Sequence, residues 1–367
     1  MKKDSMVQKS RDSATQIQAQ EITIINGIDE KRVREVCSEM AVDAIKQCTQ
    51  EATATALARI ENFTTALIPR MEKIEEDFRS FTDPSFQFEL QKAQKVAACT
   101  ERTDDYDLLS ELLVHRAENK TNRKTISSIS KAIEIVDQID DDALCGLTII
   151  YTITQLIPTS GHIMSGLRTI DDIWKALCYV ELPSGFDWLE HLEILGAVRI
   201  SSVNTFNKLK EIYYKNFDGY TCVGIKEGSE AYKTAEDIFK QANVTPYPLE
   251  NHELNNGYLR IPVVNKKDIS RMAYFKEIGD EKYTVAILEP TEIEALEKVW
   301  GLYESDAKKK QEVKTAFWNL WNQFDTLQKV TEWWDAIPRS FEITPIGKVI
   351  AHANSQKYCS QIPDIKL

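Results

Sequence analysis

The sequence predicts a mainly α-helical protein with a short β segment in front of it and an α+β unit in its second half. Apolar residues recur at a spacing near 3.6 through most of the first 140 residues, which is the period of amphipathic helices. Strand-like stretches are short and scattered, as in "ITII", "GYLRIPVV" and "KYTVAIL". The 367 residues also exceed the roughly 250–300 that one hydrophobic core organises, so more than one core is expected.

The β segment, residues 1–28, contains the stretch "SATQIQAQEITIING" and is called the β leader below. Ile17 and Ala19 share one strand parity, and Ile22 and Ile24 share the other. A break or bulge near Gln20 would place all four on one face, giving two strands of four or five residues. Such a pair is marginally stable alone and leaves unpaired backbone groups along its edges.

We expect these edges to be paired by the β leaders of other copies, which would make the protein a homo-oligomer. The residues expected at this contact are Ile17, Ala19, Ile22, Ile24 and Ile25. Two alternatives remain open: an edge strand on later β elements of the same chain, or disorder of the first 20 residues.

Residues 29–139 predict a helical bundle. Its first member is expected to be one long helix from Asp29, the N-cap, to Pro69, which should end or kink it. Ile28 and Val33 have the spacing of a hydrophobic staple across that cap. Further helices follow, one of them with Asp83 as cap and Pro84 at the first helical position.

The remaining residues, 140–367, predict a winged-helix-like core in two pieces, 140–202 and 339–367, with a mixed α/β insertion over 203–338. "WLEHLEILGAVRIS" indicates a helix ended by a glycine and followed by the strand Ala197–Ser201. "RSFEITPIGKVIAHAN" indicates a strand that runs into a helix capped by Thr344. Each half lacks a sequential partner, so the two strands are expected to pair antiparallel.

With the leader "DSATQIQAQEITIINGI", the central "WLEHLEILGAVRIS" and the tail "ITPIGKVIAHAN" in view, the chain resembles a family of uncharacterised bacterial proteins over nearly its whole length. The tail motif is the more specific part. The resemblance implies a setting in anti-phage defence and supplies no catalytic residues. Where relatives carry Gly-Asp pairs in the leader, this chain has Ala19-Gln20-Glu21.

The charge and composition of the chain limit the classes of partner that it is expected to bind. A net charge of −12 opposes non-specific attraction to nucleic acid or anionic lipid. No run approaches the 18 apolar residues of a membrane span, and the basic start "MKKDSMVQKS" lacks the apolar core of a secretory signal. The seven scattered cysteines match neither a disulfide framework nor a zinc site. We therefore expect a cytoplasmic protein with reduced cysteines and no membrane partner.

Catalytic candidates are few. His352 and Asn354, in "AHAN", are the best, although a helix-face histidine that hydrogen-bonds the wing is the favoured interpretation. The aspartates of residues 104–107 and 140–142 could hold a cation, but each group stands where a helix should begin, so capping is favoured. "PTSGHIMSG" has neither a phosphate-loop nor a nucleophile-elbow pattern and is expected to be a plain loop. No metal or cofactor is expected.

Two further patterns bear on partners. The helix that would enter the major groove, Ser184–Leu195, carries Asp187, Glu190 and Glu193 and no Lys or Arg, so duplex DNA binding is unlikely to be its role. Aromatic residues cluster at Trp318, Trp321, Phe324, Trp333 and Trp334, a spacing more typical of a core between helices than of a ligand cage.

The sequence thus favours a homo-oligomeric assembly, sensor or interaction protein without its own catalytic centre, with its own copies and a phage or defence-system protein as partners. A nuclease or other hydrolase with a dispersed carboxylate site is the main alternative, and a DNA-binding regulator is the second.

Overall fold

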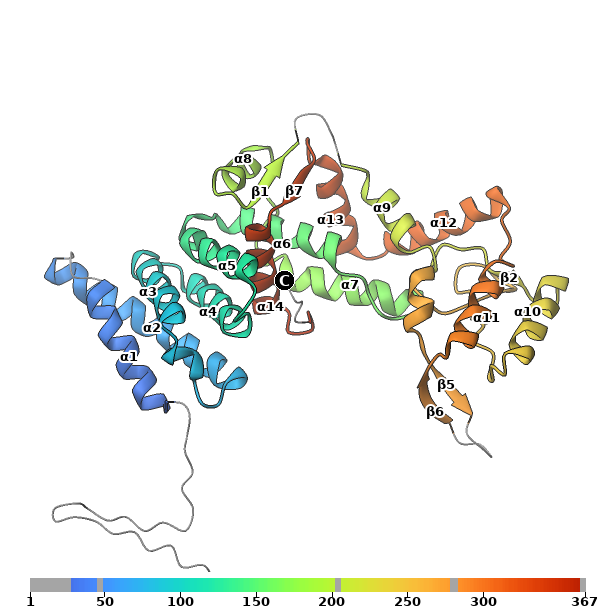
Figure 1. Cartoon of the computed structure of the whole chain (residues 1–367). Helices are drawn as coiled ribbons and strands as arrows, with labels where there is room; N and C mark the ends of the chain where they lie inside the picture. The colour runs from blue at the N-terminus through green and yellow to red at the C-terminus, as the bar shows by residue number, and fades with distance from the viewer. Residues whose placement is uncertain (1–27, 45–48, 202–205, 278–282, 364–367) are drawn as a thin grey trace, which may run out of the picture.

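The computed structural model describes residues 28–44, 49–201, 206–277 and 283–363. The prediction for the β leader, with Ile17, Ala19, Ile22, Ile24 and Ile25, lies outside the described residues. The described part is mainly α-helical, as predicted, with short strands in small antiparallel sheets (Figure 1). No helix of the described ranges combines the length and apolarity that crossing a membrane requires.

The N-terminal bundle contains five helices, at the blue-to-teal end of Figure 1: α1 (Glu30–Ala44), α2 (Gln50–Ile74), α3 (Pro84–Cys99), α4 (Thr103–Glu118) and α5 (Arg123–Ile135). A short 3₁₀ turn, η1 (Arg79–Thr82), lies between α2 and α3, and another, η2 (Val136–Gln138), follows α5. The predicted caps at its helix starts are confirmed. Asp29 Oδ1 accepts the N–H of Arg32 at 2.8 Å, and Asp83 accepts the N–H of Ser85 at 2.9 Å.

The single long helix predicted from Asp29 to Pro69 is wrong. The chain forms α1 and α2 instead, with Thr49 in an extended conformation before α2. Both helices pack on α3, so the break buries apolar residues of both halves in one bundle, which one straight helix could not do. Pro69 does not end α2, which continues to Ile74. Buried Leu67, Ile68 and Met71 hold the helix on the core on both sides of the proline.

Next along the chain come α6 (Asp141–Gln155), α7 (Ile163–Leu177), α8 (Asp187–Ile194) and β1 (Val198–Ile200), and the chain ends with β7 (Phe341–Ile343) and α14 (Pro345–Tyr358). Helix α6 is buried all round from Ala143 to Ile153. Helix α14 packs on α4, α5 and α6. One continuous core therefore includes residues from both sides of position 140, such as Leu109 and Leu147.

Strands β1 and β7 pair antiparallel, with Val198 opposite Ile343 and Ile200 opposite Phe341. This confirms the predicted pairing of two segments that lie far apart in sequence. Helix α8 ends in a Schellman motif, in which Gly196 has a φ of +74° and the Ala197 N–H bonds the Leu192 carbonyl at 2.8 Å. Glycine is needed at this φ because an L side chain is strained there.

The tail motif Thr344-Pro345-Ile346-Gly347 closes this unit. Thr344 Oγ1 donates to the Gly196 carbonyl at 2.7 Å and accepts the Gly347 N–H at 3.2 Å. A Cβ at Gly347 would lie 2.1 Å from the Ala197 carbonyl oxygen, so only glycine permits this approach. These contacts of Thr344 and Gly347 with Gly196–Ala197 are called the Thr344 clasp.

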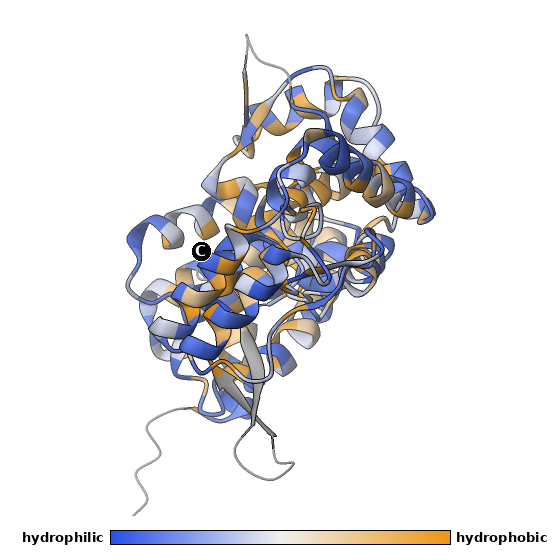
Figure 2. Cartoon of the chain, turned by 90° about the vertical axis from the view of Figure 1, so that its right-hand side faces the viewer, coloured by the Kyte–Doolittle hydropathy of each residue, from blue (hydrophilic) through white to orange (hydrophobic). Residues whose placement is uncertain are grey.

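The segment between the two pieces adds the following elements: α9 (Leu209–Asn216), β2 (Ile225–Lys226), α10 (Glu230–Gln241), β3 (Glu250–Asn251), β4 (Tyr258–Arg260), η3 (Lys266–Arg271), β5 (Ala273–Glu277), β6 (Tyr283–Ile287), α11 (Pro290–Trp300), α12 (Ala307–Trp321) and α13 (Asp325–Ala336). The sheet β2-β4-β3 and helices α10 and α11 surround a second core, on the right of Figure 1. Bands of apolar and polar residues alternate along the helices, as amphipathic packing requires (Figure 2).

Helices α9, α12 and α13 contribute to the first core, not the second. Trp321 and Trp334 are buried there, and Trp318, Phe324 and Trp333 pack against it half-buried. The aromatic residues therefore form core, as their spacing predicted. Trp333 also donates its indole N–H to the Pro183 carbonyl at 2.8 Å, which ties α13 to the loop before α8.

The Thr344 clasp yields a stability prediction. Thr344→Val keeps the shape of the side chain but leaves the Gly196 carbonyl and the Gly347 N–H without this partner. We expect it to lower the free energy of unfolding by about 1–3 kcal/mol, while Thr344→Ser, which keeps the hydroxyl, loses less than half of that. Urea unfolding of the three proteins measures both values. Equal stability of the Val and Ser variants would show that the hydroxyl is unimportant.

Candidate functional site

A pocket of about 830 Å³ lies where the two cores meet and is called the junction pocket. Its walls come from the loop after α6, from the segment leading into β3, and from the chain between β4 and the end of η3. Val264 on its wall belongs to the first core and Val263 to the second. Polar groups at the pocket are supplied chiefly by His162, Glu250, Asp268 and Arg271.

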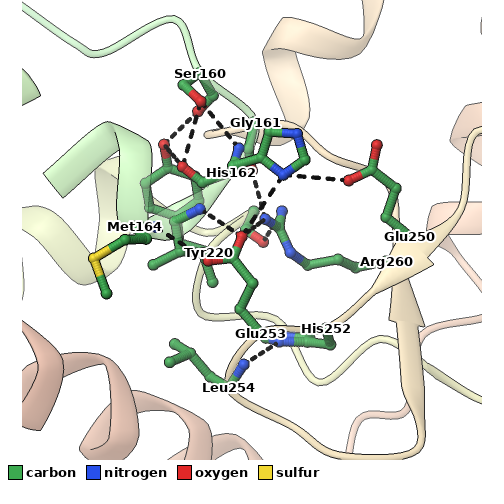
Figure 3. A network of polar contacts seen from close by, with 12 residues as sticks. Ser160, Gly161, His162, Met164, Tyr220, Glu250, His252, Glu253, Leu254 and Arg260 are labelled. Carbon is green, nitrogen blue, oxygen red and sulfur yellow. Dashed lines mark hydrogen bonds and ion pairs between the residues drawn. The ribbon is translucent and has the colours of Figure 1, made fainter. Parts of the chain in front are cut away.

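A buried arginine holds the loop that forms one wall. Arg260, on β4, is 2% exposed, and its guanidinium donates to the carbonyls of Gly219, Ile261 and Val263, each at 3.3 Å. Its other terminal nitrogen donates to the Gly161 carbonyl of the wall loop (Figure 3). Arginine suits this position because its planar fork presents several fixed donors at once.

Tyr220 fixes the same loop from the other side. Its hydroxyl donates to the Ser160 carbonyl, and its ring lies 5.6 Å from the Arg260 guanidinium carbon. A Cβ at Gly161 would lie 1.8 Å from the Pro262 carbonyl oxygen, so the loop approaches the opposite wall as only glycine allows. The wall is thus held by backbone contacts that span the two cores.

Glu253 connects the second core to α7. Its two carboxylate oxygens accept the N–H groups of Ile163 and Met164, at 2.8 and 3.1 Å, at the first turn of α7 (Figure 3). A carboxylate at a helix N-terminus also complements the positive end of the helix dipole. Above it, the exposed ring of His162 places Nδ1 3.4 Å from Glu250 Oε2 and 3.9 Å from Glu253 Oε1. His162 and Glu250 can therefore contact a bound molecule, whereas both carboxylate oxygens of Glu253 already accept hydrogen bonds from α7.

Cys222 and His252 are residue types that can act as nucleophile and base, but their contacts and pKa values do not activate them for this role. The Cys222 sulfur lies 3.9 Å from His252 Nε2, which also lies 2.9 Å from the Cys222 carbonyl. His252 Nδ1 accepts the Leu254 N–H at 3.1 Å, so both ring nitrogens are engaged by backbone. Burial raises the pKa of the Cys222 thiol to about 12 and lowers the pKa of His252 to about 4. The pair is a neutral structural contact and not an activated thiolate.

His352 and Asn354 lie in the first core and not at the junction pocket. His352 is fully buried on α14, with Nδ1 3.1 Å from the Tyr151 hydroxyl and its ring 5.1 Å from that of His115. Asn354 donates to Thr148 Oγ1 at 2.9 Å and to the Tyr179 hydroxyl at 3.3 Å. This part of α14 faces α6, and the β1–β7 pair, which the sequence predicted as a wing, is bonded by Thr344.

The aspartate groups stand at helix starts, as predicted, with Asp104 and Asp105 in the first turn of α4 and Asp141 and Asp142 in that of α6. Arg102 pairs with Asp105 at 3.1 Å and with Asp141 at 3.0 Å, and Arg70 pairs with Asp107 at 2.7 Å. Asp140, at the N-cap position of α6, makes no side-chain cap bond. No cluster of three or more metal-binding side chains occurs in the described ranges.

The sequence does not predict the junction pocket, because "PTSGHIMSG" carries no binding motif and predicts only a plain loop. Two signals could have marked it. One is Arg260, a lone arginine between the apolar residues of "GYLRIPVV", which is unusual for a strand buried in a core. The other is Gly161, directly before a histidine in a loop between two long helices.

His252 yields a pH prediction. Its pKa in the folded state, about 4, lies below the ordinary value of 6.5, so the unfolded chain takes up this proton first. The contribution of His252 to stability is complete above pH 6.5 and is lost as the pH falls toward 4. We expect the stability difference between wild type and His252→Asn, which cannot titrate there, to fall by roughly 3 kcal/mol over this window.

Urea unfolding of both proteins between pH 7 and pH 4 measures that difference, and acid effects on carboxylates common to both cancel. A difference that stays constant with pH would mean that His252 is protonated as easily in the folded as in the unfolded state.

Comparison with known proteins gave one result. A search of curated proteins and a search of solved structures found no match. The model of one protein family matches residues 27–366. The description of this family is a name ending in "-like", and the family is uncharacterised. This match begins at the end of the β leader and includes both cores, the junction pocket and the Thr344 clasp. The chain therefore belongs to this uncharacterised family.

Proposed function

We propose that this protein is a homo-oligomeric sensor or interaction protein of bacterial anti-phage defence, cytoplasmic and without a catalytic centre of its own. The β leader joins its copies, and the junction pocket is the part that receives a ligand or a segment of a partner protein. The defence setting comes from the family resemblance of the leader and tail motifs.

The observation that supports this proposal best is the position of the junction pocket between two cores. A pocket at such a boundary is a common ligand site, because one occupant touches both parts. Here the wall loop is bonded to the second core through Arg260, and α7 is bonded to it through Glu253. An occupant that prefers one arrangement of these contacts would shift the population of the whole molecule toward it.

The state of the polar residues favours binding over chemistry. Cys222 and His252 are neutral and held by backbone, and Asp105, Asp107 and Asp141 are paired with arginines. These observations weigh against the alternative of a nuclease or other hydrolase with dispersed carboxylates.

Helix α8 weighs against the second alternative, a DNA-binding regulator. Its Glu193 accepts the Ile200 N–H at 2.7 Å, and His191 Nε2 lies 2.7 Å from the Gln138 carbonyl. The helix thus uses polar side chains for contacts within the chain, and its remaining acidic residues would repel phosphates.

Anti-phage protection tests the proposal directly. A bacterial host that carries the gene should show fewer plaques, and His162→Ala with Glu250→Ala at the pocket should abolish this protection. A control pair on α10, Glu230→Ala with Lys233→Ala, removes an exposed ion pair and should leave protection intact. Equal plaque counts for wild type and an empty host would refute the defence role, and full protection by the pocket variant would refute the role of the pocket.

The β leader yields a prediction on assembly. Deletion of residues 1–27 should lower the mass in solution, because the strands that we expect to pair between copies are removed. Ile22→Pro should do nearly the same, since proline removes a ladder donor while the chain keeps its length. Multi-angle light scattering gives the copy number. The same number of copies for wild type and deletion variant would leave the leader with a different purpose.

A prediction on nucleic acid follows from α8 and the carboxylates. The purified protein should leave plasmid and phage DNA intact with magnesium or manganese present, and it should not shift a DNA duplex at sub-micromolar concentration. Agarose and native gels measure both. Salt-sensitive binding that is lost on changing Asp187 or Glu190 would instead support the regulator.

A further inference from the structure

A second pocket, on the first core, has a charge opposite to that of the chain. Its volume is about 760 Å³, and it lies between the first turn of α5 and the first turn of α14, with α6 behind it. Its cationic residues are Arg123 and Lys124 of α5 and Lys348 of α14. We call it the basic pocket. None of the residues that line it belongs to the junction pocket except Gln155.

The lining of the basic pocket contains three cations and no carboxylate. The whole chain has 57 acidic and 45 basic residues, so a pocket whose charged residues are all basic runs against the charge balance of the chain. Like charges that face one hollow repel each other, and this cost is removed when an anion binds among them.

Neighbouring lysines show that the lack of carboxylates is local. Lys120 pairs with Glu75 at 2.6 Å, and Lys131, further along α5, pairs with Glu134 at 2.6 Å. Within the described ranges, no ion pair is found for Arg123, Lys124 or Lys348. The chain therefore neutralises cations on either side of the pocket and leaves those of the pocket available.

Other lining groups suit an anion with an organic part. Ser127 presents a hydroxyl beside the cations, whereas the Ser128 hydroxyl donates to the Lys124 carbonyl at 3.0 Å. Pro345 supplies apolar surface, with the buried Val349 and Tyr151 behind it. The helices α5 and α14 both begin here, so the positive ends of two helix dipoles add to the field. Their first N–H groups are partly occupied by the caps Asn122 and Thr344, so the side-chain cations carry the recognition.

We propose that the basic pocket binds a small organic phosphate of nucleotide size, such as a nucleoside di- or triphosphate. Arg123 offers the planar fork that pairs with a phosphate, and Lys124 and Lys348 supply two further charges. The volume is that of a small-molecule site. A nucleic acid fits the chain less well, because a long polyanion would extend beyond the pocket along a chain whose net charge is −12. This proposal is independent of the proposed function.

Titration calorimetry of the full-length protein with ATP, ADP, AMP and inorganic phosphate tests the proposal. We expect ADP or ATP to bind more tightly than inorganic phosphate, to weaken with rising salt, and to raise the melting temperature, because α14 starts at the pocket. The double variant Lys124→Gln with Lys348→Gln should lose affinity by roughly a hundredfold, about tenfold for each charge-assisted contact.

The control variant Lys233→Gln with Lys240→Gln removes the same net charge from exposed positions on α10 and should bind as wild type does. Arg123→Gln, at an exposed position, provides a second pocket variant if the double variant does not fold. Absence of binding at millimolar nucleotide would overturn the proposal, as would equal affinities of pocket and control variants. Tighter binding of a single-stranded oligonucleotide than of ATP would overturn it in favour of nucleic acid.

Discussion

The Thr344 clasp is the contact on which the arrangement of the chain depends. It joins Gly196–Ala197, at the end of α8, to the start of α14, although almost 150 residues separate them. Because β1 pairs with β7 beside it, the whole segment between them must leave and return at one place. That requirement permits a second core to be inserted without interrupting the first, and it explains why α9, α12 and α13 lie against the first core on the way out and back.

The same constraint positions both pockets. With its first turn fixed by the clasp, α14 lies against α5 and α6, and Lys348 comes to the mouth of the basic pocket opposite Arg123 and Lys124. On the other side of α6, the loop that ends at His162 reaches the second core, where Arg260 holds it. Helix α6 thus connects the two pockets, through Gln155 at its last turn.

The sequence predicted best those features that depend on residues close together in the chain. Local signals were reliable: the caps at Asp29 and Asp83, the glycine end of α8 and the proline start of α14 depend on neighbouring residues only. The β1–β7 pairing was predictable as well, because each half-motif carried its own turn chemistry. The break between α1 and α2 was not, since the apolar period of 3.6 continues through it and only packing on α3 decides where the helix must turn.

The sites were less predictable than the fold, for a related reason. His352 stood in the most distinctive motif, yet that motif is distinctive because Thr344 and Gly347 form a tight contact, and His352 packs inside the core. The residues at the pockets carried no motif. Arg260, Glu253 and Gly161 acquire their roles from contacts across two cores, which no spacing within one segment can show.

Electrostatics adds support to the proposal that the molecule binds a ligand at its pockets. The three cations around the basic pocket have no carboxylate among them, and a bound anion would offset their mutual repulsion. Conversely, the low pKa of His252 makes its imidazole a weak base, and backbone groups engage both ring nitrogens, so it is poorly suited to deprotonate the Cys222 thiol. Charge is thus available at the surface pockets, where a ligand can meet it, and is removed from the buried pair that could otherwise have carried out a reaction.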